Sequence, residues 1–95
     1  MLEDVAQAKI NRGQRARHLL DDPVLAEALD ALLADADKVC DQTKPNEVEL
    51  REECYRAKQA IRALRKKLGY WLTDGTLEQM HLDELNAKEK RNAVQ

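Results

Sequence analysis

Apolar or small residues recur at alternating intervals of four and three along one stretch of the chain. These positions are Leu50, Cys54, Ala57, Ile61, Leu64, Leu68 and Trp71. Because a helix has 3.6 residues per turn, this spacing places them on one face and predicts a helix with an apolar seam. Leu64 stands at the centre of that seam, so we expect its side chain to be buried.

A second stripe with the same rhythm precedes the first. Its members are Leu25, Leu29, Leu32, Ala36 and Val39. The polar segment 41–46, which contains Pro45, cannot continue a helix, so the two seams are predicted to face each other in an antiparallel helical hairpin of about 23–41 and 47–73. Asp22 is the expected N-cap and Pro23 the first helical residue. Asn46 with Glu49 resembles a capping box for the second helix.

Weaker helical signals flank the hairpin. An N-terminal helix over 2–20 is expected to break near Gly13, because glycine disfavours a helix interior. Asp74-Gly75 reads as a helix stop, and Thr76 with Gln79 resembles a capping box that begins a short C-terminal helix. The predicted fold is therefore all-α, a single domain over 1–95. We expect residues 1–14 and 87–95 to be flexible or ordered only by a partner.

The residue inventory argues against catalysis and metal binding. The chain has no serine, and its soft metal ligands His18, Cys40, Cys54 and His81 are scattered over different predicted helices. We therefore expect no enzyme activity, catalytic residue, cofactor or metal. In the predicted hairpin Cys40 lies opposite position 48, about 9 Å along the axis from Cys54, so we expect free thiols rather than a disulfide.

Charge and hydropathy indicate which partners to expect. A net charge of −2 with mixed surface charge does not describe a chain that coats nucleic acid or acidic membranes. The N-terminus is acidic and lacks a continuous apolar run, which predicts neither a secretory signal nor a membrane span. We expect a protein that starts in the cytosol, with no membrane partner and no small-molecule substrate.

An apolar patch on the long predicted helix is the leading candidate site. That helix is longer than its partner, so its last turns lack a covering helix, and such patches commonly mark protein interfaces. The predicted interface residues are Leu68, Trp71, Leu72, Leu77 and Met80. A protein partner and a homo-oligomer are therefore expected.

Two basic clusters leave a nucleic-acid alternative open. They comprise Arg12, Arg15 and Arg17 in the N-terminal segment, and Arg62, Arg65 and Lys66 in the long helix. In a small DNA-packaging or regulatory DNA-binding subunit, these side chains would contact phosphate. A solvated face beside an apolar seam also explains the second cluster, whose charge complements the acidic segment 23–41.

One pattern extends over most of the chain. The string Ala16-Arg17-His18-Leu19-Leu20-Asp21-Asp22-Pro23-Val24-Leu25, the loop with Pro45, the acidic-to-basic helix 49–68 and Asp74-Gly75 together resemble short helical proteins of tailed bacteriophages and prophages. Those proteins are usually encoded among head and packaging genes. The resemblance covers about residues 16–85. It implies a virion structural or assembly protein that binds itself or a capsid, portal or tail component, located in the host cytoplasm during assembly and then in the virion.

Overall fold

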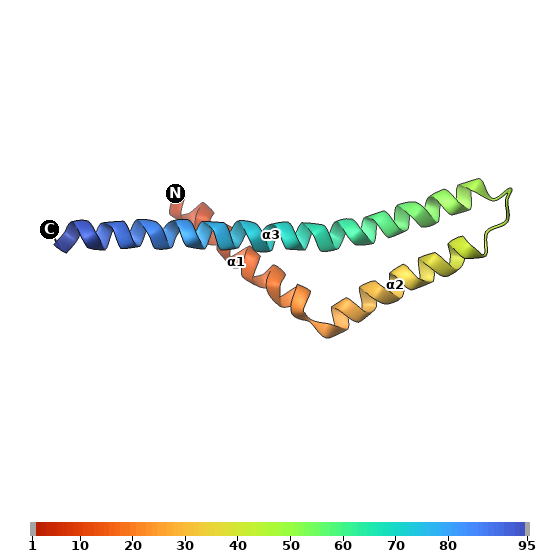
Figure 1. The fold of residues 1–95 in the computed structure, drawn as a ribbon, viewed down its shortest axis with the longest axis horizontal. Helices are drawn as coiled ribbons and strands as arrows, with labels where there is room; N and C mark the ends of the chain where they lie inside the picture. Colours follow the sequence, from red (N-terminus) through yellow and green to blue (C-terminus); the bar gives the residue numbers. More distant parts are fainter. Residues whose placement is uncertain (1, 95) are drawn as a thin grey trace. The chain divides into compact units, whose positions relative to one another are not determined.

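Three helices make up the chain in the computed structural model, which describes residues 2–94 (Figure 1). Helix α1 spans Leu2–Asp21, α2 spans Pro23–Asp41 and α3 spans Val48–Val94. The predicted all-α class is confirmed, since the described residues contain no strand. Met1 and Gln95, which belong to the terminal segments expected to be flexible, lie outside the described residues.

The junction between α1 and α2 follows the local chemistry that the sequence predicts. Asp22 has an extended backbone, and its carboxylate accepts hydrogen bonds from the amides of Val24 (2.8 Å) and Leu25 (3.2 Å). Pro23 occupies the start of α2, where its missing N–H costs nothing. The predicted N-cap is therefore confirmed.

Two predicted interruptions are wrong. Helix α1 continues through Gly13, and α3 continues for 47 residues through Asp74, Gly75 and Thr76, so there is no separate short C-terminal helix. Thr76 does not cap a new helix, because its hydroxyl donates to the carbonyl of Leu72 at 2.9 Å, one turn earlier. None of the described glycines has a positive φ, so neither Gly13 nor Gly75 acts as a terminator.

The contacts group the residues into two compact units that share α3. The first unit comprises residues up to His18 and those from Leu68 onward, and the second comprises Leu19–Lys67. The sequence predicts a single domain over the same residues.

In the first unit, α1 and the later part of α3 make an antiparallel pair. Lys9 forms an ion pair with Glu78 at 3.6 Å, whereas Arg12 lies over Trp71, so residue numbers rise on one helix as they fall on the other. The buried apolar side chains among the described residues of this unit are Ala6, Ile10 and Ala16 on α1 and Leu68 on α3, and two of them are alanines. Their spacing on α1 is that of one helix face.

Two glycines bring the backbones of this pair together. A Cβ atom on Gly13 would lie 2.8 Å from the carbonyl oxygen of Trp71 and 2.9 Å from Cα of Gly75. A Cβ on Gly75 would lie 2.9 Å from Cα of Gly13 and 3.0 Å from the carbonyl oxygen of Lys9. The neighbours are backbone atoms that cannot rotate away, so the helix crossing requires glycine on both sides. This close approach is the reason for the two glycines that the sequence analysis takes as helix breakers.

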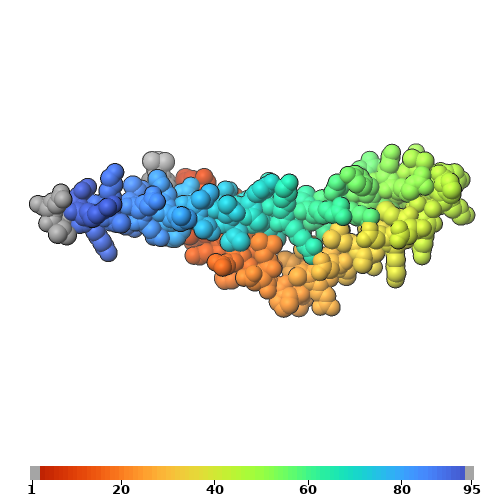
Figure 2. All heavy atoms as spheres, in the orientation of Figure 1, coloured from red at the N-terminus to blue at the C-terminus, as the bar shows by residue number. Residues whose placement is uncertain are grey.

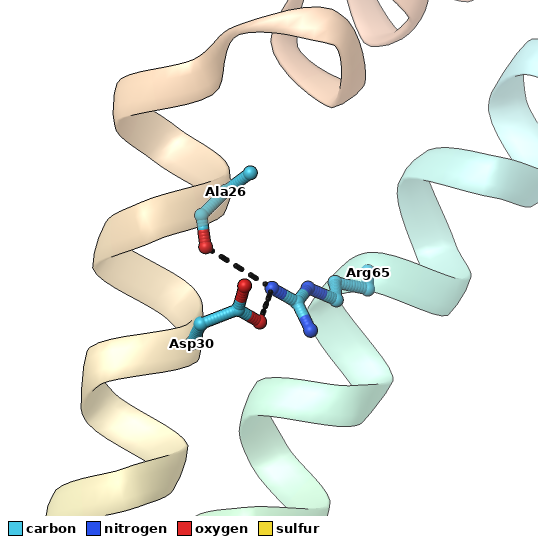
Figure 3. Close-up of polar contacts among 3 residues, drawn as sticks. All are labelled: Ala26, Asp30 and Arg65. Atoms are coloured by element: carbon cyan, nitrogen blue, oxygen red, sulfur yellow. Dashed lines mark hydrogen bonds and ion pairs between the residues drawn. The ribbon is translucent and has the colours of Figure 1, made fainter.

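In the second unit, α2 packs against residues 48–67 of α3, and the two segments lie against each other in Figure 2. Arg65 donates to the Asp30 carboxylate at 2.5 Å and to the Ala26 carbonyl at 3.2 Å (Figure 3). Lys58 forms a second ion pair with Asp37. These contacts follow an antiparallel order.

The connection between α2 and α3 shifts the helices relative to the expected register. Arg51 donates to the carbonyls of Lys44 (2.9 Å) and Pro45 (3.2 Å), which holds the turn beside the beginning of α3. The expected Asn46–Glu49 capping box does not form among the described residues, and the Glu47 carboxylate instead accepts from the Lys44 amide at 2.9 Å within the turn. Because the turn extends along α3, α2 ends opposite a later residue of α3 than a tight reversal would give.

The same shift corrects the expected position of the cysteines. The predicted turn places Cys40 opposite position 48, but Cys40 and Cys54 share a side-chain hydrogen bond. The predicted separation of about 9 Å is therefore wrong, although both cysteines are free thiols in the structure.

The seam of α3 is also only partly buried. Cys54 and Leu68 are buried, but Leu64 is 48% exposed and Leu50 is 37% exposed. The expectation of a buried Leu64 is wrong, because a single neighbouring helix covers less than the full apolar face. Leu64 lies on the flank of the contact rather than at its centre.

The glycine contact generates a matched test. We expect Gly13→Ala to destabilise the fold by about 1–3 kcal/mol, because the added methyl group forces two backbones apart. Gly69→Ala is the control, since a Cβ there meets nothing within 4 Å. It should stabilise the fold by about 0.5–1 kcal/mol through helix propensity. Chemical denaturation followed by circular dichroism measures both. Equal stabilisation by the two changes would show that the close crossing does not form.

Candidate protein interface

The five predicted interface residues do not share one environment. Leu68 is buried, Trp71 and Leu72 are half-buried, and Leu77 and Met80 are 58% and 55% exposed. All five belong to the first unit, where α1 packs against one side of α3. Leu68 is therefore not part of an exposed patch, contrary to expectation, and only Leu77 and Met80 remain largely open.

Trp71 is covered through a cation–π contact. The Arg12 guanidinium carbon lies 4.7 Å from the centre of the Trp71 ring. Such contacts favour a cation over the electron-rich face of an indole. Arg12, which the nucleic-acid alternative assigns to phosphate, therefore has an intramolecular partner.

A shallow cleft of about 260 Å³ brings together parts of the predicted patch and of α1. Leu72 and Met80 line it from α3, and Ile10, Gly13 and Arg17 line it from α1. The missing side chains at Gly13 and Gly75 leave this space open beside the crossing. Met80, although largely exposed, therefore also lines the cleft between α1 and α3.

A second groove in the first unit is absent from the sequence-based candidates. It has a volume of about 430 Å³, with Val5, Leu82 and Leu85 among its apolar lining and Glu78 and Glu89 among its acidic lining. Val5 is 56% exposed and Leu85 is 45% exposed. The antiparallel register that places the first turns of α1 beside residues 78–89 of α3 could not be read from the spacing of either segment alone.

The second unit presents exposed apolar residues that the sequence analysis assigns to its seams. Leu32 (51%), Val39 (42%), Leu50 (37%) and Leu64 (48%) are all accessible although they occupy heptad positions. The heptad spacing identified these residues correctly as apolar stripes. It could not show that the contact between α2 and residues 48–67 of α3 leaves one flank of each stripe uncovered.

The six basic residues of the nucleic-acid alternative separate into the two units. Arg12, Arg15 and Arg17 belong to the first, and Arg62, Arg65 and Lys66 to the second. Arg65 is engaged by Asp30 and Ala26, and Arg12 by Trp71. Phosphate binding by these two side chains would have to replace contacts that already stabilise the fold.

Two groups at the contact between α2 and α3, the Cys54 thiol and the Lys58 ammonium, have raised pKa values. Burial, followed by the hydrogen bond to Cys40, raises the pKa of the Cys54 thiol. The hydrogen bond to Asp37 raises the pKa of Lys58. A thiol with a raised pKa carries less thiolate at neutral pH and therefore reacts more slowly as a nucleophile.

No group of three or more His, Cys, Asp or Glu side chains in residues 2–94 is arranged to hold a metal ion. None of the described helices combines the length and apolar character of a membrane span. The chain matches no protein-family model, curated protein or solved structure.

The thiol environment predicts different alkylation rates. At mildly alkaline pH we expect iodoacetamide to modify Cys54 roughly fivefold or more slowly than Cys40, because Cys54 is 7% exposed and its pKa is raised. Peptide mass spectrometry of a time course measures each site. In denaturant the two rates should converge. Equal rates in the folded protein would contradict the buried position of Cys54.

Proposed function

We propose that this chain is a non-enzymatic structural or assembly protein of a tailed bacteriophage or prophage. It acts through protein–protein contacts with itself or with a capsid, portal or tail component, in the host cytoplasm during assembly and then in the virion. A helical hairpin formed by α2 and the first part of α3 is the proposed contact element. The resemblance of about residues 16–85 to short helical proteins of tailed bacteriophages and prophages, which are usually encoded among head and packaging genes, supports the setting.

The surface area of the chain is the observation that carries the proposal. It exposes 7781 Å² at a mass of 10.9 kDa. A folded monomer of this mass exposes about 5,600 Å². The surplus of about 2,200 Å² is larger than the area that one partner contributes to a typical stable interface, about 800 Å².

The surplus includes many large apolar side chains. Six hydrophobic residues among those described are buried, whereas thirteen large hydrophobic residues are exposed, from Val5 in α1 to Leu85 in α3. Isolated exposed apolar residues are common, but stripes of them at heptad spacing are typical of helices that pack against further helices. An apolar surface with this spacing fits a protein partner that contributes further helices.

The DNA-binding alternative receives less support from the contacts. Arg12 and Arg65 are engaged within the fold, and the net charge of the chain is −2. A protein that binds the phosphate backbone loses affinity steeply as salt rises, whereas an apolar interface does not. Salt dependence therefore separates the two functions.

We expect the purified chain to form a complex larger than 10.9 kDa. The complex should persist when sodium chloride is raised from about 0.1 M to about 1 M, because its contacts are apolar. Sedimentation equilibrium at both salt concentrations measures the mass, and a parallel titration with duplex DNA measures nucleic-acid binding. A monomer that binds DNA at low salt, loses it at high salt and is weakened by Arg62→Ala would refute the proposed function.

A further inference from the structure

We propose that two copies of this chain associate through one face of the second unit, which we call the lateral stripe. It consists of Leu25, Leu32 and Val39 on α2 and of Leu50, Ala57 and Leu64 on α3. The proposal rests on the proposed assembly function and specifies the surface and the partner. The partner is a second copy of the same unit.

The ion pairs define one edge of the contact between α2 and α3. Asp30 and Asp37 are seven residues apart on α2, and each pairs with a basic residue of α3. At 100° per residue, the buried Leu29 lies between the Asp30 side of α2 and the side that carries Leu25 and Leu32. The α2 part of the lateral stripe therefore lies on the edge opposite the ion pairs.

The same geometry holds on α3. Lys58 and Arg65 incline toward the ion-pair edge, whereas Ala57 and Leu64 lie on the other side of the buried Cys54 position. In an antiparallel pair of helices, the edges opposite a shared set of ion pairs lie on the same face. The α2 and α3 parts of the lateral stripe thus form one continuous face.

This face is apolar and accessible. Leu32, Val39, Leu50 and Leu64 are between 37% and 51% exposed, Ala57 is exposed and Leu25 is half-buried. No member of the stripe is charged or polar. Repetition every seven residues on two neighbouring helices is the pattern that another pair of helices can match by knobs-into-holes packing.

The charges of the two helices point to a second copy as the occupant. Helix α2 has five acidic residues and one lysine, a net charge of −4, whereas residues 48–67 of α3 have seven basic and three acidic residues, a net charge of +4. A second copy supplies both signs in the same geometry. Charge attraction favours α2 of one copy over α3 of the other and disfavours the arrangement with α2 over α2.

The resulting dimer is a four-helix bundle whose two-fold axis runs along the helices. Within one copy, Asp30 pairs with Arg65 and Asp37 with Lys58, so position 32 lies level with about position 63. With α2 over α3 of the second copy, Leu32 meets Leu64 of that copy. The surplus surface of the chain is sufficient for such an interface.

Charged substitutions on the stripe test the surface. We expect Leu32→Glu and Leu64→Glu in the full chain each to weaken dimerisation at least about tenfold, because a carboxylate would be buried against apolar side chains. Tyr55→Glu is the matched control, since Tyr55 is also 58% exposed but lies on the ion-pair side of α3, away from the lateral stripe. Sedimentation equilibrium measures affinity, and circular dichroism checks that helicity is retained.

Cross-linking tests the arrangement. In a Cys40→Ala, Cys54→Ala background, we expect an equimolar mixture of the Leu32→Cys and Leu64→Cys chains to form a mixed disulfide on oxidation. Disulfides only between identical chains would overturn the arrangement. A chain that stays monomeric, or that loses association equally with Tyr55→Glu, would overturn the lateral stripe. Salt-resistant association that neither Leu32→Glu nor Leu64→Glu weakens would also overturn the lateral stripe. The proposed assembly function would then still stand.

Discussion

The contact between Gly13 and Gly75 is the constraint on which the first unit depends. Each glycine costs its helix about 1 kcal/mol in propensity relative to alanine. The close crossing offsets this cost by bringing Ala6, Ile10, Ala16 and Leu68 into a buried contact that larger residues would hold apart. A shift of α1 along α3 would place a side chain against Gly13. The glycine pair therefore favours one alignment of these helices over others of similar apolar pattern.

The second unit obtains its stability from a different arrangement. One edge of the α2–α3 contact carries the polar contacts of Arg65 and Lys58, the centre carries Leu29 and the thiol pair, and the other edge is apolar and open. Exposed ion pairs contribute little to stability, about 1 kcal/mol or less, but they select which helix faces are paired. That selection places the remaining apolar residues together on one surface.

Sequence reasoning succeeded where local chemistry decides the structure. Asp22 and Pro23 end one helix and start the next through interactions within four residues, and such signals can be read directly. It failed at Gly13 and Gly75, because a glycine that breaks an isolated helix is the same residue that permits a close helix crossing. The alignment of α2 with α3 depended on how Arg51 holds the turn, a contact between residues six and seven apart that no heptad pattern encodes.

The burial of Leu64 depended on the number of neighbouring helices, which the spacing of apolar residues does not specify. The predicted interface of Leu68, Trp71, Leu72, Leu77 and Met80 divided for the same reason, since α1 covers three of these residues.

The unbroken course of α3 through Gly75 has a consequence for how the chain unfolds. Starting a helix is unfavourable, because several backbone dihedral angles must be restricted before the first hydrogen bond forms, whereas each later residue adds at lower cost. Since one helix of 47 residues supplies a side to both units, a nucleus formed in either unit can propagate into the other. A substitution that destabilises one unit therefore also lowers the cooperativity with which the other unit unfolds, because the two share the backbone of α3. This holds even where no side chain of the second unit has changed.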